Sequence, residues 1–192
     1  MKRALLLLSI FATTSAFAQI SKGNILAGGG ATFTSSRHEI DNYALTNLPV
    51  TATESSLTVS LNGGYFLVDK LAVGLRLGVD RVAEDISINS YSYENTTSQW
   101  GPFVRYYFLH KSKTVNLFAD ASYFSERDGI FKKDVSPLKG YNLVAGPAFF
   151  LNRAVALELT LGYSHSKYKN RENGNNTFLS GVGLQVHLGK GK

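Results

Sequence analysis

Four charged residues interrupt stretches that are otherwise apolar, small or neutral, and their types could support either ion pairing or gating. Arg76 and Arg105 supply two guanidinium groups, and Asp120 and Glu158 supply two carboxylates. Guanidinium and carboxylate groups form strong, geometrically defined pairs, so an enclosed set of two cations and two anions can neutralise itself. Such a set can hold an interior together, or it can act as a switchable gate for small ions. Which of these applies depends on the elements that carry the four residues.

A second candidate for chemistry is His165, which lies between Ser164 and Ser166. A histidine base beside a serine can activate the hydroxyl for attack on an ester. In an extended strand, however, adjacent side chains point to opposite faces, so neither serine would share the face of His165. The residue two positions further on, on the same face, is Lys167. We therefore expect no catalytic residues, and we keep a lipid-modifying, deacylase-like enzyme that uses His165 as the alternative.

Metal and cofactor sites are not indicated. His38, Glu39 and Asp41 are residue types that bind metals, but they lie in a polar segment without a second ligand cluster at a defined spacing. The chain contains no cysteine, so neither a disulfide framework nor a thiolate site is available. We predict that the protein binds no metal and no cofactor.

The elements that would position the four charged residues alternate with period two. Residues 154–166 show the pattern most clearly, because large apolar residues there alternate with small or polar ones, and Glu158 falls on the polar side. That side carries glycine and threonine rather than several lysines and glutamates, which indicates an enclosed face. Related alternation recurs along the chain. The predicted strands are residues 23–34, 55–66, 71–80, 98–108, 115–125, 140–150, 154–166 and 176–188.

The connections between these strands alternate between long and short. The short turns are residues 67–70, 110–113 and 151–153. The long polar segments are residues 36–53, 82–97, 126–139 and 167–175. Outer-membrane barrels have short turns at one end and longer loops at the other. The sequence therefore predicts an all-β fold, an eight-stranded antiparallel up-and-down transmembrane β-barrel.

Lysines and aromatic residues indicate which face meets lipid. The lysines of residues 19–192 all lie at segment ends or in loops, and a lysine at the bilayer midplane would cost roughly 2–4 kcal/mol. Aromatic residues of the apolar face lie at strand ends, as in the interfacial girdles of membrane barrels. A soluble lipocalin-like carrier is the alternative. The aromatic residues predicted for the two girdles are Phe33, Trp100, Tyr123, Tyr163 and Phe178 toward the long loops, and Tyr65, Tyr106, Phe108 and Phe149 toward the short turns.

The four charged residues fall at similar heights in the predicted strands. Counted from the short-turn ends, Arg76 and Asp120 lie about five residues up, Glu158 about four and Arg105 about three, at a rise of roughly 3.3 Å per residue. Arg105 and Asp120 are near-diagonal neighbours on adjacent strands. Because side chains fill the interior of a small barrel, we predict that this interior polar layer is structural, with ion passage as the alternative.

Two local patterns, residues 101–108 (GPFVRYYF) and residues 156–163 (ALELTLGY), carry a family resemblance. Together with the eight-strand rhythm they resemble the small outer-membrane β-barrel family, which includes the transmembrane domain of outer membrane protein A, and in particular its Bacteroidetes-type members. The resemblance covers residues 23–188. It implies an integral protein of the bacterial outer membrane.

The beginning of the chain is typical of an exported protein. Lys2 and Arg3 precede the apolar residues 4–12, and Ala16 and Ala18 form a small-x-small cleavage site. We expect a signal peptide over residues 1–18, cleaved after Ala18, and one barrel domain over residues 19–192. Cleavage would remove two of the 20 basic residues and none of the 14 acidic ones, which leaves a formal net charge of +4.

The expected partners follow from this location. The remaining basic residues lie mostly at segment ends rather than in one patch, which argues against nucleic-acid binding. We expect contacts with outer-membrane lipid and lipopolysaccharide, and with an extracellular partner through the four long polar segments. The predicted function is a structural or surface-interaction role without catalysis.

Overall fold

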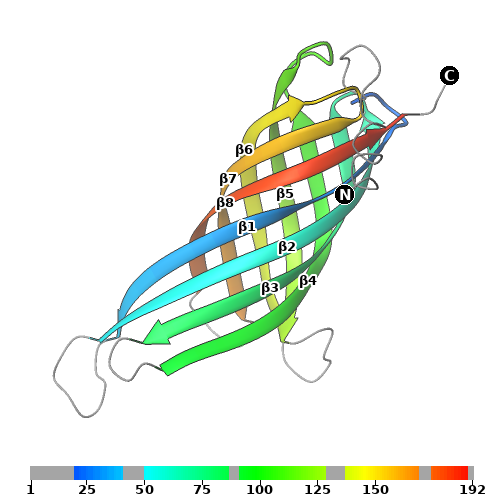
Figure 1. The fold of residues 1–192 in the computed structure, drawn as a ribbon. Coiled ribbons are helices and arrows are strands. Elements are labelled where there is room, and N and C mark those ends of the chain that lie inside the picture. The colour runs from blue at the N-terminus through cyan, green and yellow to red at the C-terminus, as the bar shows by residue number, and fades with distance from the viewer. Residues whose placement is uncertain (1–19, 41–49, 87–90, 129–136, 169–173, 190–192) are drawn as a thin grey trace, which may run out of the picture.

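The computed structural model describes residues 20–40, 50–86, 91–128, 137–168 and 174–189. These residues form eight antiparallel strands that close into one barrel, in which each strand pairs with its sequence neighbours and the last pairs with the first (Figure 1). The predicted all-β up-and-down barrel is therefore confirmed. Within the described residues, no helix is long and apolar enough to cross a bilayer. The strands are β1 (Ile25–Ile40), β2 (Val50–Val68), β3 (Leu71–Ile86), β4 (Tyr91–Tyr107), β5 (Val115–Asp128), β6 (Leu138–Phe150), β7 (Val155–Tyr168) and β8 (Asn175–Leu188).

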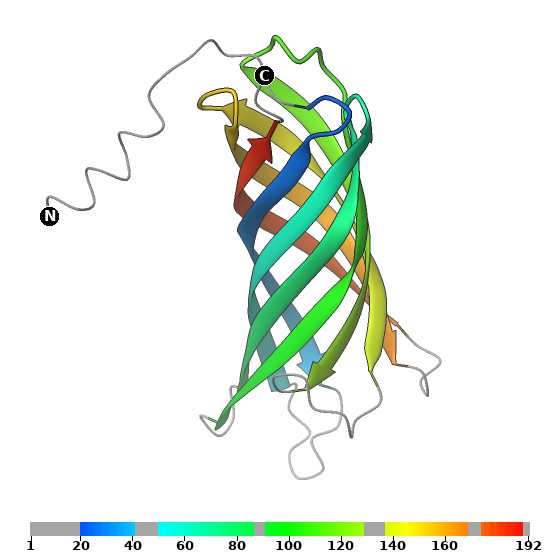
Figure 2. The same cartoon turned by 90° about the vertical axis from the view of Figure 1, so that its right-hand side faces the viewer.

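Short turns join β2 to β3, β4 to β5 and β6 to β7 at one end of the barrel, where β1 also begins and β8 ends (Figures 1 and 2). We call this the short-turn end and the opposite one the long-connection end. The turn after β2 is tight, and Lys70 there has a φ of 70°, the left-handed conformation that such turns require. The predicted alternation of short and long connections holds only in part, because residues 87–90 between β3 and β4 form a shorter connection than residues 108–114 between β4 and β5.

At the long-connection end the strands extend further than the apolar alternation predicts. β1 continues to Ile40 and β2 begins at Val50, while β3 continues to Ile86 and β4 begins at Tyr91. Backbone hydrogen bonds do not depend on apolar side chains, so strand pairing continues after the apolar pattern has ended. The loop boundaries predicted for residues 36–53, 82–97, 126–139 and 167–175 are therefore wrong at both margins.

Two Gly-Pro steps interrupt the ladders within strands. Gly101-Pro102 lies in β4 and has no paired residues on β5, although pairing resumes in the same register on both sides. Gly146-Pro147 in β6 has the same relation to β7. Proline lacks an N–H to donate, and the preceding glycine lies so close to the neighbouring backbone that a Cβ would overlap a carbonyl group. Glycine is therefore needed at both positions.

The apolar core of the interior lies at the short-turn end. Segment 20–24 closes over this end, because Ile20 accepts a hydrogen bond from the Lys70 amide at 2.8 Å and Phe66 and Asn24 pair at 3.0 Å. Ile20 is almost completely buried. The core residues are Ile20, Leu26, Phe66, Ala72, Phe103, Tyr107, Phe118, Ala148, Phe150 and Ala156.

Candidate functional site

The four predicted interior charges meet in one ion-paired network. Arg105 donates from Nε to Asp120 Oδ2 at 3.0 Å and from Nη1 to both oxygens of Glu158 at 2.9 and 3.0 Å. Arg76 reaches across β4 to the same Asp120, with Nη2 2.9 Å from Oδ2. Arg105 and Asp120 lie directly opposite each other in the register rather than diagonally. The layer is neutral in sum, because two guanidinium groups meet two carboxylates.

Burial and ring contacts hold this network in place. Arg105 is 3% exposed and Glu158 is 1% exposed. The guanidinium carbon of Arg105 lies 4.6 Å from the centre of the Phe118 ring, and that of Arg76 lies 5.1 Å from the centre of the Phe103 ring. A guanidinium over an aromatic face is favourable and less costly to desolvate than an ammonium. The geometry therefore favours a fixed layer across the barrel.

Two residues that the sequence patterns did not indicate extend the network toward the short-turn end. The Tyr107 hydroxyl donates to Glu158 Oε1 at 3.2 Å and lies 3.1 Å from His187 Nε2. Both side chains are fully buried. The rings of Phe66, Phe150 and His187 pack around Tyr107 with centroid distances of 5.7 to 6.5 Å. This aromatic layer fills the barrel between the charged layer and the short-turn end. Its sequence signal is the large inward residues near that end of several strands, such as Phe66 on β2 and Phe150 on β6.

Between the charged layer and the long-connection end, the interior opens into a polar cavity of about 1000 Å³. Its floor includes Arg76, Arg105, Glu158 and Gln185, and its walls reach the strand ends of the long-connection end. Hydroxyl and amide side chains dominate the lining. Asn62 and Gln185 bridge the floor through a 2.9 Å hydrogen bond. The described interior is thus a polar cavity toward the long-connection end and is filled by side chains toward the short-turn end.

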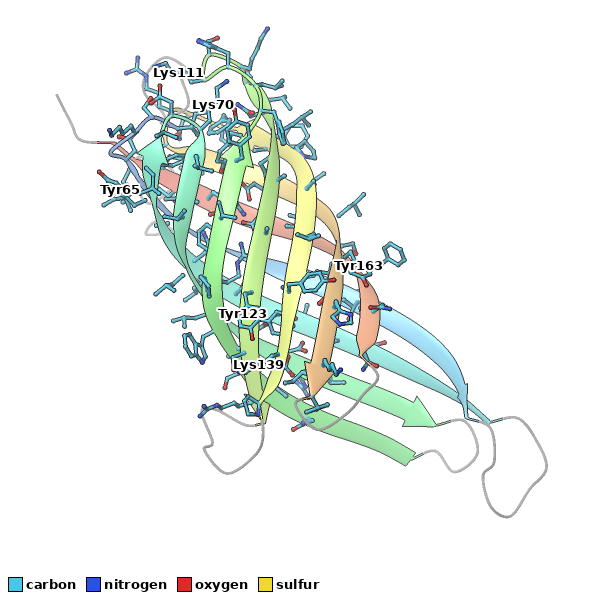
Figure 3. All side chains as sticks on the ribbon, turned by 180° about the vertical axis from the view of Figure 1, so that it is seen from behind. Tyr65, Lys70, Lys111, Tyr123, Lys139 and Tyr163 are labelled. Carbon is cyan, nitrogen blue, oxygen red and sulfur yellow. The ribbon has the colours of Figure 1, made fainter. Side chains whose placement is uncertain are left out.

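The outer wall of the barrel is apolar and exposed. Leu61, Leu75 and Leu161, which lie in the middle of their strands, are among the most exposed apolar residues. In Figure 3, Tyr65 lies toward the short-turn end, and Tyr123 and Tyr163 lie toward the other end. Tyr163 is half-buried and packs against the rings of Tyr141 and Phe178. The other predicted girdle residues are exposed: Phe33, Trp100, Tyr123, Phe178, Tyr65, Tyr106, Phe108 and Phe149.

The described lysines keep to the ends of the barrel, as predicted. Lys70 and Lys111 lie in short turns, and Lys139 lies next to the long-connection end of β6 (Figure 3). Lys167 lies next to the long-connection end of β7. A soluble carrier of apolar ligands would need the opposite arrangement, with a polar outside and an apolar cavity. The distribution of polar and apolar residues therefore favours the membrane barrel over the lipocalin-like alternative.

The predicted catalytic alternative has the wrong geometry. His165 lies beside Tyr141, and its Nδ1 is 2.7 Å from Asn176 Oδ1. Ser164 and Ser166 line the interior cavity instead. Alternation along β7 places these serines on the opposite face from His165, as the sequence predicts. A histidine and a serine that face opposite sides of the barrel wall cannot act as base and nucleophile.

The predicted negative result for metals concerns residues that the structure describes only in part. The backbone of His38 and Glu39 belongs to β1, while their side chains and Asp41 lie outside the described residues. Elsewhere in the described chain, no three His, Asp or Glu residues are grouped as a metal site requires. Residues 1–19 also lie outside the described residues, so cleavage after Ala18 stays a prediction.

Comparisons with known proteins show the fold. No protein-family model and no curated protein sequence matches this chain. The crystal structure of Neisserial surface protein A matches with a TM-score of 0.57 and 16% identity, over 86% of this chain and 97% of that one. The outer membrane protein OprG from Pseudomonas aeruginosa matches with a TM-score of 0.55 and 15% identity, over 90% and 100% of the two chains. The chain therefore has the fold of the small eight-stranded outer-membrane barrels.

Proposed function

We propose that this protein is an integral outer-membrane barrel without catalytic activity, which stabilises the envelope and presents its long-connection end to the surroundings. The observation that carries the proposal is the combination of an exposed apolar wall with an interior blocked by paired charges and aromatic rings. Eight strands leave an interior that side chains can fill. A blocked barrel of this kind suits anchoring and surface contact better than the passage of solutes.

Conductance measurements test the structural role of the interior layer. In planar lipid bilayers, the purified protein should produce no single-channel steps, because Arg105 joins Asp120 and Glu158 across the barrel. Steady ion currents through the wild-type protein would contradict the proposal and favour a gate. Incubation with lipopolysaccharide, followed by mass spectrometry of its acyl chains, tests the absence of catalysis. Release of a fatty acid that His165→Ala abolishes would establish the enzymatic alternative.

We further propose that lipopolysaccharide binds to the outer wall near the long-connection end. Lys139 and Lys167 are exposed, lie directly opposite each other on β6 and β7, and form no ion pair with a described residue. Like charges opposite each other on one face of a sheet are unfavourable. A phosphate between the two ammonium groups removes this repulsion and forms charge-assisted hydrogen bonds. Tyr141, which is exposed and lies two residues from Lys139 on the same face of β6, places this pair at the edge of the apolar wall.

The lipid proposal is tested by thermal unfolding in two kinds of vesicle. The wild-type protein should unfold at a higher temperature in vesicles that contain lipopolysaccharide than in phosphatidylcholine vesicles. The Lys139→Gln/Lys167→Gln variant should lose most of this difference. The matched control is Lys111→Gln/Lys113→Gln, which removes the same charge from a short turn at the other end. Equal stabilisation of both variants would refute the assignment.

A further inference from the structure

Asp80 differs from Asp120 and Glu158, the two carboxylates of the charged layer, because no ion pair joins it to a cation among the described residues. It lies on β3, faces the polar cavity and is 9% exposed. Its Oδ1 accepts hydrogen bonds from Ser56 Oγ at 2.6 Å and from Thr58 Oγ1 at 3.1 Å. No Lys or Arg of the described residues forms an ion pair with it. An enclosed carboxylate is normally paired with a cation, since desolvation of the charge is costly.

A second polar group at the same place also lacks a partner. Thr97 lies directly opposite Asp80 in the register of β3 and β4 and lines the same cavity. It is 4% exposed, and its Oγ1 has no hydrogen-bond partner. Buried hydroxyl groups in folded proteins are almost always hydrogen-bonded. An anion without a cation and a hydroxyl without a partner on adjacent strands point to a ligand that carries a positive charge and donates hydrogen bonds.

The oxygen atoms around Asp80 define the chemical class of that ligand. Ser56 and Thr58 already donate their hydroxyl protons to Asp80, so they offer lone pairs but no further donor. The group therefore presents oxygen acceptors and a single negative charge. Calcium sites usually combine several carboxylates and carbonyl oxygens, whereas an ammonium group has one positive charge and three N–H donors. A primary ammonium matches both the charge and the hydrogen-bonding capacity.

The surroundings leave room for such a molecule. The cavity of about 1000 Å³ is lined mainly by hydroxyl and amide side chains and reaches the long-connection end. Arg76, four residues away on the same face of β3, is held by Asp120 and Ser122 and lies roughly 13 Å along the strand, so it does not neutralise Asp80. We propose that Asp80 and Thr97 bind the primary ammonium group of a small polar molecule that enters from the long-connection end. This site is independent of the structural role and of lipid binding.

Calorimetric titration with n-propylammonium chloride tests the site in the folded barrel in a non-ionic detergent. The wild-type protein should show saturable binding. Asp80→Asn should weaken it by about tenfold or more, since it removes a charge-assisted interaction. Thr97→Val, which keeps size and charge, should weaken it by a smaller factor and serves as the second variant if Asp80→Asn does not fold. Glu126→Gln, with the same change in charge at another cavity position, should bind like the wild type.

Three outcomes would overturn the proposal. The first is no saturable binding by the wild-type protein, and the second is equal binding by the wild type and Asp80→Asn. The third is saturable binding of sodium chloride that depends on Asp80 without a response to propylammonium, which would assign the site to an alkali metal ion. Tetramethylammonium has the same charge but no N–H group and should bind more weakly than propylammonium. Equal affinities for the two would contradict the role given to Thr97.

Discussion

Substitution of Glu158 by alanine is the sharpest test of the interior layer. The change leaves Arg105 buried with Asp120 alone, and Asp120 is already shared with Arg76. Tyr107 loses an acceptor at the same time. Removal of one partner of a buried ion pair costs about 3–5 kcal/mol. The polar cavity next to the charged layer allows water to approach the unpaired charge. We therefore expect a loss of about 3 kcal/mol in the free energy of unfolding.

The assay is urea unfolding in lipid vesicles, followed by the fluorescence of Trp100. This residue is the single tryptophan of the chain and lies exposed on the outer wall. At a denaturant dependence of roughly 2 kcal/mol per molar urea, a loss of about 3 kcal/mol lowers the midpoint by about 1.5 M. Thr160→Ala, two residues further along the same face of β7, is the matched control and should shift the midpoint by much less.

A double variant separates the effect of charge from that of packing. Arg105→Met/Glu158→Gln replaces one cation and one anion by uncharged side chains of similar volume. It leaves Arg76 paired with Asp120. Apolar or neutral replacements of a buried pair are often neutral in stability, so the double variant should be more stable than Glu158→Ala. The reasoning is refuted if Glu158→Ala unfolds at the same urea concentration as the Thr160→Ala control, or if the double variant is the least stable.

Three further predictions concern packing and the lipid-facing wall. Gly146→Ala should destabilise the barrel because its Cβ would meet the carbonyl oxygen of Leu159, whereas Gly63→Ala, which has open space, should be neutral in the same urea assay. Phe178→Ala should reduce the free energy of unfolding in vesicles by about 1–3 kcal/mol, since this ring is 86% exposed on the outer wall. Tyr107→Phe loses two buried hydrogen bonds and should lower the thermal unfolding temperature; an unchanged temperature would contradict their structural importance.

The fold was predictable because lipid imposes a strict rule on the middle of each strand. Outward positions there are apolar, apart from the exposed Ser180 on β8, so period-two alternation marks the eight strands and their two faces. The rule ends where the wall leaves the bilayer. Residues 36–40 and 82–86 belong to strands although their polar sequence resembles a loop. Strand pairing in that region depends on backbone hydrogen bonds, which leave no pattern in the sequence.

The charged layer was predictable in composition and height but not in its connections. Counting along strands placed Arg76, Arg105, Asp120 and Glu158 together. The tilt and stagger of the barrel, however, determine which residues meet across it, and therefore Arg76 reaches Asp120 over an intervening strand. Residues far apart in sequence come together for the same reason: Tyr107 meets His187, 80 positions away. Asp80 could not be recognised either, because its distinguishing feature is that no cation among the described residues pairs with it.

The unequal strand lengths have a consequence for how the molecule is seen from outside the cell. β1 to β4 contain 16 to 19 residues, whereas β5 to β8 contain 13 or 14. At about 3.3 Å per residue along strands that tilt by roughly 40° from the barrel axis, the first four strands form a wall roughly 8 Å taller than the rest. In the proposed orientation, the connections after β1 and β3 start at the edge of this wall that is farthest from the bilayer. The connections after β5 and β7 start closer to the bilayer. Antibodies or phages that must pass through a layer of surface polysaccharide should therefore reach the first pair of connections more readily than the second.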